Sequence, residues 1–292
     1  MLPYFGGKGK TELGRWLFNS FNLNGIKTYV EPFSGMFGIY LGKFSDFSQV
    51  PNIVYNDIDK QNCNVFNCAQ YPIIFIDEIH KSFQKSGLFY TKRGTNYHEK
   101  YEHYKSIYLD YHDGKKVLPD IDLSVKNYEA AVIYSFLRLT SIKQFHFLNI
   151  DFKEYTKEES WYKRYKFFQP LINKLANPEF TSKIARISSI TADDFEIVMN
   201  KHNTPDSFIY LDPPYYEREA LYDPTKKGVF TVEDHKRLAN AVSKSKARVA
   251  ISYYYFDEIY NLYPKSQYKY KRLTVRNNAG EKDAVEILIM NY

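Results

Sequence analysis

Short apolar runs alternate with amphipathic stretches along most of this chain. Runs rich in β-branched and aromatic residues have the length of strands, and three of them end in acidic or polar residues. These are Lys27–Val30 before Glu31, Ile53–Tyr55 before Asn56 and Asp57, and Ser207–Leu211 before Asp212. Strands that alternate with helical segments are typical of an α/β fold, which the pattern therefore predicts.

The C-terminal part continues the same alternation. A helix is predicted over Val232–Ser245, because Thr231 and Asp234 have the spacing of a capping box. Further strands are predicted over Arg248–Ser252, Tyr268–Val275 and Ala284–Met290, the last two joined by a turn at residues 277–280. The sheet is therefore expected to close with an antiparallel hairpin.

The pattern changes between about Phe66 and Ile184, where aromatic and basic residues follow one another through long helical stretches. Within this region, Tyr128–Ile142 has the apolar spacing of a buried helix. We expect an inserted, mainly helical domain at residues 67–184, and a sheet domain built from residues 1–66 and 185–292.

Composition narrows the class of protein only a little. The 292 residues are 44% hydrophobic and 25% charged, which is ordinary for a globular chain. Cys63 and Cys68 lack the neighbours of a zinc site or disulfide framework, so buried free thiols are expected and no metal is predicted.

Neither a membrane-spanning run nor a signal pattern is present, so a cytoplasmic protein is expected. The net charge of +6 suits a polyanionic partner and a plain basic enzyme equally.

The strongest local motif is Asp212-Pro213-Pro214-Tyr215, directly after an apolar strand. Two prolines cannot continue a sheet ladder, so they form a rigid turn with exposed acceptors. An amino group on an aromatic ring is a poor nucleophile, and acceptors at both of its N–H groups favour the more reactive pyramidal form. Asp212 and the Pro213 carbonyl can supply those acceptors, while Tyr215 can stack on the ring. The alternative is a proline-rich turn at a sheet edge.

A second motif follows the first strand. The loop Glu31-Pro32-Phe33-Ser34-Gly35-Met36-Phe37-Gly38 is followed, about 20 residues after Gly35, by Asp57, which is the spacing of a nucleotide-cofactor site. A glycine there lets a cofactor approach the backbone, and the acidic residue accepts from ribose hydroxyls. Glu31 is placed to face a positively charged amino acid tail. Glycine turns after strands are also common without a ligand.

Two weaker motifs complete the set. Tyr4-Phe5-Gly6-Gly7-Lys8 combines a glycine turn with an aromatic ring and a lysine, which suits either a ligand contact or a simple terminal turn. Asp194 and Phe195 follow the apolar run Ile187–Ile190, where the carboxylate can accept from an adenine amino group and the ring can pack on its face. An N-capping aspartate is the competing explanation.

Together and in this order, the motifs resemble the Dam-like family (D12 class, alpha group) of DNA adenine-N6 methyltransferases. The likeness also covers Tyr128–Ser141, Phe230 with Thr231, Ser252 with Tyr253, and the terminal segment Glu286–Tyr292. It implies a Rossmann-like methyltransferase sheet with a closing hairpin, an inserted DNA-recognition domain, and adenine-specific methyl transfer to flipped bases in double-stranded DNA. A cognate restriction endonuclease is a further implied partner, and the chain is expected to be a monomer or weak dimer.

The resemblance also implies the residues of the sites. Those expected to catalyse transfer are Asp212, Pro213, Pro214 and Tyr215. Those expected to bind S-adenosylmethionine are Tyr4, Gly7, Lys8, Glu31, Pro32, Phe33, Ser34, Gly35, Asp57, Ile58, Asp194, Phe195 and Asp212. Those expected to contact DNA are Lys143, Gln144, His146, Lys163, Arg164 and Lys166, for which a solvated surface is the alternative.

The chain departs from the family pattern at two places. Phe37 stands where relatives usually have glycine, and the glycine comes one position later as Gly38, which bears on cofactor affinity or loop geometry. Ser141–Phe147 lacks the Asn-Gly turn and the arginine of relatives, so a different DNA target is expected. Two other functions stay open. One is methylation of another amino acceptor, such as an RNA base or a protein glutamine, and the other is a catalytically inactive DNA-binding relative.

Overall fold

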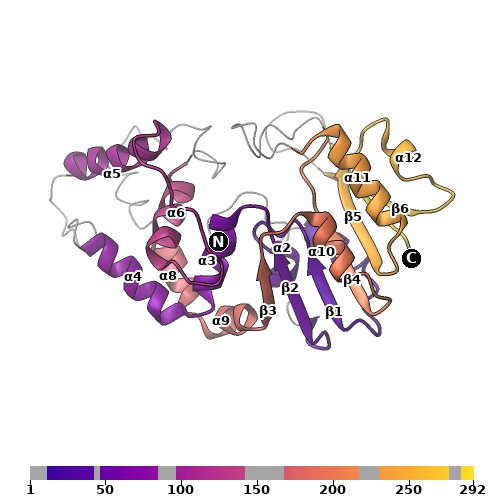
Figure 1. Ribbon diagram of the computed structural model, residues 1–292, viewed down its shortest axis with the longest axis horizontal. Helices are drawn as coiled ribbons and strands as arrows, with labels where there is room; N and C mark the ends of the chain where they lie inside the picture. Colours follow the sequence, from indigo (N-terminus) through magenta and orange to yellow (C-terminus); the bar gives the residue numbers. More distant parts are fainter. Residues whose placement is uncertain (1–11, 43–46, 85–96, 142–167, 217–229, 276–283) are drawn as a thin grey trace. The chain divides into compact units, whose positions relative to one another are not determined.

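The computed structural model describes residues 12–42, 47–84, 97–141, 168–216, 230–275 and 284–292. The chain divides into two compact units (Figure 1). One comprises Gly6–Ile58 and Arg186–Tyr292 and is called the sheet unit here, because it contains the seven-stranded sheet. The other comprises Met1–Phe5 and Asp59–Ala185, and it is called the helical unit.

The sheet has the strand order β3-β2-β1-β4-β5-β7-β6. The first five strands run parallel, whereas β7 runs antiparallel to both β5 and β6. Every predicted strand is confirmed to within two residues of its ends. The strands are β1 (Thr28–Glu31), β2 (Asn52–Asn56), β3 (Ile187–Thr191), β4 (Ser207–Leu211), β5 (Arg248–Tyr254), β6 (Lys269–Val275) and β7 (Ala284–Met290).

The strand order reverses between β1 and β4. From this point the sheet continues through β2 and β3 on one side and through β5 on the other. Val30 of β1 pairs with Ile209 of β4, so the loops that begin at Glu31 and Asp212 leave neighbouring strand ends. In open α/β sheets, ligands bind outside the carboxyl ends of the strands at such a reversal.

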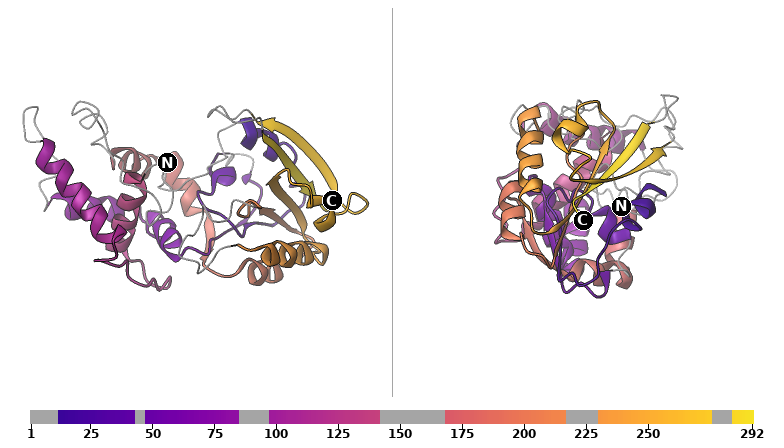
Figure 2. Two further views of the ribbon diagram at one scale, coloured as in Figure 1. Left: turned by 90° about the horizontal axis from the view of Figure 1, so that it is seen from above. Right: turned by 90° about the vertical axis from the view of Figure 1, so that its right-hand side faces the viewer.

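Helices cover both faces of the sheet (Figure 2). In β4, Ile209 and Leu211 belong to the core that includes Leu238 of α11, whereas Phe208 and Tyr210 contact the ring of Phe21 on the opposite face. A strand buried on both faces has no polar positions, which explains its uninterrupted apolar run. The helices of this unit are α1 (Glu12–Phe18), α2 (Gly38–Gly42), α10 (Phe195–Lys201), α11 (Val232–Ser243) and α12 (Ile259–Leu262).

In the helical unit, α6 packs against α3 and α4. Its N-cap Asn127 accepts from the Ala130 amide and is bonded to Asn64 of α3, while its Tyr134 hydroxyl donates to Asp59 at 2.5 Å. The prediction of a buried helix here is confirmed. The helices are α3 (Lys60–Ala69), α4 (Pro72–Gln84), α5 (Tyr97–His112), α6 (Tyr128–Thr140), α8 (Gln169–Leu175) and α9 (Pro178–Ala185).

Cys63 and Cys68 are buried free thiols on α3, as predicted. Burial raises the pKa of the Cys68 thiol to about 12, so this sulfur stays protonated. Within the described ranges, no helix combines the length and the apolar composition needed to cross a membrane.

Candidate active site

The loop after β1 is held in place by the end of β2. The Gly35 amide donates to the Asp57 carboxylate at 2.8 Å, and the Tyr55 hydroxyl donates to the Gly35 carbonyl at 2.9 Å. Gly35 has a φ of 47°, in the left-handed region that glycine adopts without strain. The glycine and the acidic residue that the sequence spacing pairs are therefore in direct contact.

Asn56 joins the ends of three neighbouring strands. Its side-chain nitrogen donates to the carbonyls of Pro32 and Asp193, at 2.9 and 3.0 Å. Its side-chain oxygen accepts from the Thr191 hydroxyl at 2.7 Å and the Asp193 amide at 2.9 Å. Because Asn56 is completely buried, these bonds fix the loops after β1 and β3 against each other.

Glu31 places a buried carboxylate at the end of β1. It is 3% exposed, and its carboxylate accepts from the Tyr29 hydroxyl at 2.7 Å. Burial, followed by the nearby Glu31 charge, raises the pKa of Tyr29 well above its usual value, so the phenol remains a donor. The Ser34 hydroxyl donates to the backbone carbonyl of Glu31 at 2.7 Å. A hydrogen-bonded acid at this position is a fixed acceptor for a cationic ligand group.

Three aromatic rings, from the loop after β1, the start of α10 and the segment before α11, contact one another. Phe33 stacks on Phe195 with ring centroids 5.5 Å apart, and Phe230 lies 5.5 Å from Phe33 and 5.6 Å from Phe195. Asp194 is the N-cap of α10, where its carboxylate accepts from the Glu196 amide at 2.9 Å. The capping alternative is thus confirmed, and a cofactor contact by Asp194 stays a prediction.

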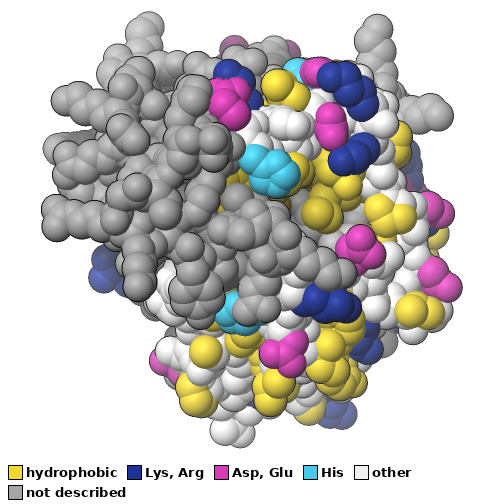
Figure 3. Space-filling view, turned by 90° about the vertical axis from the view of Figure 1, so that its left-hand side faces the viewer, with side chains coloured by type: hydrophobic (Ala, Val, Ile, Leu, Met, Phe, Trp, Pro, Cys, Tyr) yellow, Lys and Arg dark blue, Asp and Glu magenta, His cyan; other side chains and the backbone are white. Residues whose placement is uncertain are grey.

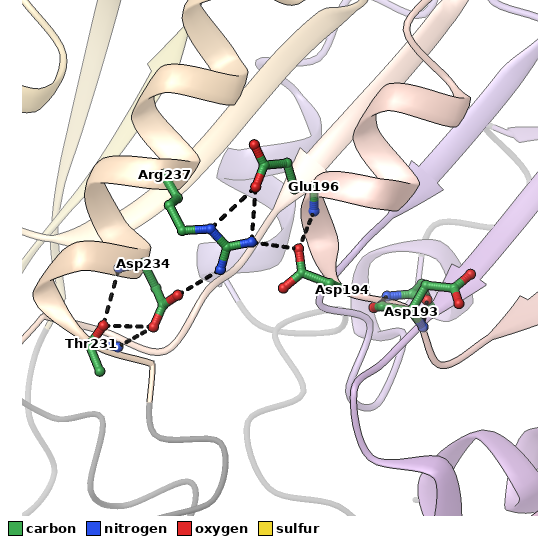
Figure 4. A network of polar contacts seen from close by, with 7 residues as sticks. Asp193, Asp194, Glu196, Thr231, Asp234 and Arg237 are labelled. Carbon is green, nitrogen blue, oxygen red and sulfur yellow. Dashed lines mark hydrogen bonds and ion pairs between the residues drawn. The ribbon is translucent and has the colours of Figure 1, made fainter.

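Arg237 of α11 connects the first turns of α10 and α11 (Figure 4). Its guanidinium lies 2.9 Å from the carboxylates of both Asp194 and Glu196, and 2.8 Å from that of Asp234. The same group lies over the Phe195 ring, 4.9 Å from its centroid. Hydrogen bonds to Asp234 and Glu196 raise the pKa of Arg237 further, so this cation persists at any relevant pH. The Phe195 ring therefore packs on a guanidinium group that three carboxylates hold in place.

The tetrapeptide that begins at Asp212 is contacted from β5 and β7. The Ser252 hydroxyl donates to the Asp212 carboxylate at 3.2 Å and lies 2.8 Å from the Tyr210 hydroxyl. At the other end, the Tyr215 hydroxyl donates to the carboxylate of Glu286 at 3.1 Å. Both ends of the motif are thus anchored by side chains that come from distant parts of the sequence.

Several predicted contacts lie outside the described residues. They include Tyr4, Gly7 and Lys8 of the predicted cofactor site. Ile58, also predicted there, is 68% exposed and directly follows Asp57. The described Lys and Arg side chains seen in Figure 3 are interspersed with Asp and Glu side chains, and do not form one basic surface. The predicted DNA contacts that lie outside the described residues are Lys143, Gln144, His146, Lys163, Arg164 and Lys166.

Some side chains that shape the site have no role among the sequence predictions. The sequence does contain a pattern that could have indicated two of them. Glu286 is an acidic residue inside an apolar strand, and Asn56 is a polar residue at the end of an apolar run. From the sequence pattern alone, Arg237 would be predicted as an ordinary surface residue of an amphipathic helix, and Tyr29 as a core residue. Their roles depend on contacts between segments that are far apart in the sequence.

The tetrapeptide that begins at Asp212 and the loop that begins at the buried Glu31 therefore leave adjacent strands where the strand order reverses. A family model described as "D12 class N6 adenine-specific DNA methyltransferase" matches residues 4–277. The chain belongs to this family. The match includes both loops of the site and nearly the whole helical unit, so the resemblance seen in the sequence is confirmed.

A curated protein is similar to part of the chain. The chain is 31% identical over 141 residues to "Type II methyltransferase M.MjaIII" from Methanocaldococcus jannaschii. The alignment covers 45% of this chain and 48% of that protein, so the chain spans about half the length of the relative it matches.

Proposed function

We propose that this protein is a site-specific DNA adenine methyltransferase that transfers a methyl group from S-adenosylmethionine to N6 of adenine in double-stranded DNA. The observation that carries the proposal is the Asp212–Tyr215 tetrapeptide at the strand-order reversal, in a chain of the D12 class family. The seven-stranded mixed α/β sheet agrees with a methyltransferase fold.

The acceptor groups and aromatic rings of the site fit S-adenosylmethionine. The buried Glu31 carboxylate suits the ammonium group of the methionine tail, and Asp57 beside the Gly35 backbone suits the ribose hydroxyls. Phe33 and Phe195 offer apolar faces to the adenine ring, with Asp194 as an acceptor for its amino group. The cofactor supplies an electrophilic methyl group on a sulfonium centre. Tyr4, Gly7, Lys8, Pro32, Ser34, Ile58 and Asp212 complete the proposed cofactor site.

Asp212 and the Pro213 carbonyl act on the target amine. By accepting from its two N–H groups, they favour the pyramidal form whose lone pair can attack a methyl carbon. Ser252 holds the Asp212 carboxylate for this task, while Pro214 keeps the turn rigid and Tyr215 stacks on the base. Stacking of this kind contributes about 1–3 kcal/mol per base.

We infer that the helical unit carries target recognition. Its Lys143, Gln144, His146, Lys163, Arg164 and Lys166 are the proposed DNA contacts. Base flipping costs a few kcal/mol, which phosphate contacts and stacking would offset. The name of the type II relative supports a cognate restriction endonuclease as a partner, and we further propose a cytoplasmic protein that is a monomer or weak dimer.

The test is incubation of the purified protein with mixed-sequence duplex DNA and labelled S-adenosylmethionine, followed by nucleoside mass spectrometry. We expect N6-methyladenine from the unaltered protein and none from Asp212→Ala. Because Asp212 acts mainly on the target amine, the variant should bind the cofactor within about tenfold of the unaltered protein, measured by calorimetry. Undiminished turnover by Asp212→Ala would refute the catalytic assignment. Cofactor binding without a methylated base would instead favour another acceptor or an inactive binding protein.

A further inference from the structure

Glu286 is an acidic residue in the middle of a buried strand. It lies on β7, where the neighbouring residues are apolar, and its exposed fraction is 0%. The strand is paired on both sides, with Tyr254 of β5 and Leu273 of β6 opposite Glu286. A carboxylate in such surroundings costs free energy unless hydrogen bonds compensate its lost hydration. Its partners therefore indicate why the position is acidic.

The hydroxyl of Tyr215 is one of those partners. It donates to the Glu286 carboxylate at 3.1 Å, across 71 residues of sequence. The Tyr215 ring also contacts the ring of Tyr254, with centroids 4.4 Å apart. Tyr254 is the β5 residue directly opposite Glu286, so one cross-strand pair holds both the ring and the hydroxyl of the tetrapeptide tyrosine.

The same strand pair reaches the other end of the tetrapeptide. Ser252, which donates to Asp212, precedes Tyr254 by two positions on β5 and so points to the same face of the sheet. Asp212 and Tyr215 are therefore both held by the β5–β7 strand pair. A change of register by one residue would remove both contacts, since it would turn these side chains to the other face.

We propose that Glu286 is a positioning residue for methyl transfer, which fixes the ring of Tyr215 in the orientation that stacks on the target base. The inference rests on the proposed function. The Glu286 carboxylate acts through the Tyr215 hydroxyl and not on the reacting atoms. Its loss leaves the stacking ring and its contact with Tyr254 in place but removes the bond that fixes the ring through its hydroxyl. The turnover number then falls, whereas cofactor affinity is unchanged, because neither Glu286 nor Tyr215 belongs to the proposed cofactor site.

The test is a double-mutant cycle with Glu286→Leu, which removes the acceptor at similar volume, and Tyr215→Phe, which removes only the hydroxyl. Single-turnover methylation of long, unmethylated duplex DNA is measured for each variant and for the pair. We expect each single variant to lose about threefold to tenfold in rate, the usual effect of one lost hydrogen bond. The double variant should be no slower than either single one, because both changes remove the same interaction.

Two further variants separate positioning from stability. Glu286→Gln keeps an oxygen acceptor and should restore most of the rate lost in Glu286→Leu. Ile287→Val removes one carbon from the neighbouring residue of β7, and should lower the melting temperature without changing the rate. Rate losses that multiply in the double variant, or full activity of Glu286→Leu, would overturn this inference alone. If the unaltered protein transfers no methyl group to DNA, the proposed function fails and the inference fails with it.

Discussion

Phe37 is the non-glycine residue with positive φ in the described part of the chain, at 53°. An L-residue in this left-handed region costs roughly 1–2 kcal/mol. The Phe37 ring is fully buried, with centroids 4.7 Å from Tyr40 and 5.2 Å from Tyr55. The backbone thus adopts a conformation that suits glycine, and burial of the Phe37 ring compensates for the strain.

This balance gives a prediction for two variants. Phe37→Ala and Phe37→Gly both lose the buried ring, which should cost about 3–5 kcal/mol of unfolding free energy. Glycine also removes the backbone strain, so Phe37→Gly should be the more stable of the two by about 1 kcal/mol. Urea unfolding followed by circular dichroism measures the difference.

Phe47 provides the matched control, since it is also fully buried but is not among the described residues with positive φ. There the alanine variant should be the more stable one, because glycine increases the entropy of the unfolded chain. Equal stability of the two Phe37 variants would contradict the strain argument.

At the scale of elements, sequence patterns predict each strand and helix better than the contacts between them. β4 was predictable because burial on both faces leaves an unbroken apolar run. α11 was predictable because its capping box, Thr231 with Asp234, is local in sequence. The hydrogen bond between Tyr215 and Glu286 was not predictable, because it requires β7 to lie beside β5, and no local sequence pattern specifies that pairing.

The first turn of α11 should make stability depend on pH. Burial alone would raise the pKa of Asp234, but hydrogen bonds from Thr231 and from Arg237 outweigh it and lower the pKa below the usual carboxyl value. A carboxylate whose pKa is lower in the folded state stabilises the fold above the unfolded pKa of about 4. That stabilisation is lost as the pH falls through the lower, folded-state pKa. Asp234→Asn should therefore cost about 1 kcal/mol at pH 7 and nothing below the folded-state pKa.

Unfolding of Asp234→Asn and of the unaltered protein at a series of pH values tests this expectation. Glu233→Gln is the matched control, because Glu233 lies in the same turn but forms an exposed ion pair with Lys236. Exposed pairs contribute little, so this variant should match the unaltered protein at every pH. A difference between Asp234→Asn and the unaltered protein that does not shrink as the pH falls would show that the charge of Asp234 is not the cause.

At the scale of the whole molecule, the two units differ in the ligand each is proposed to bind. The described residues of the proposed cofactor site belong to the sheet unit, whereas the proposed DNA contacts belong to the helical unit. The net charge of +6 does not show which unit binds DNA, because it is a property of the whole chain. Hydrogen exchange can show which unit binds each ligand, since a bound ligand slows the local opening of the segments it contacts.

We therefore expect S-adenosylmethionine to slow exchange in residues 31–37, 56–58 and 193–196, the segments joined by Asn56. Duplex DNA should slow exchange within residues 59–185, and also in the Asp212–Tyr215 segment that is proposed to hold the flipped base. Mass spectrometry of peptides from the full chain measures both effects. Asp212→Ala is the control, because it should keep the cofactor protection while losing methyl transfer. Cofactor protection confined to the helical unit would refute the assigned cofactor site, whereas DNA protection confined to the sheet unit would refute the recognition role of the helices.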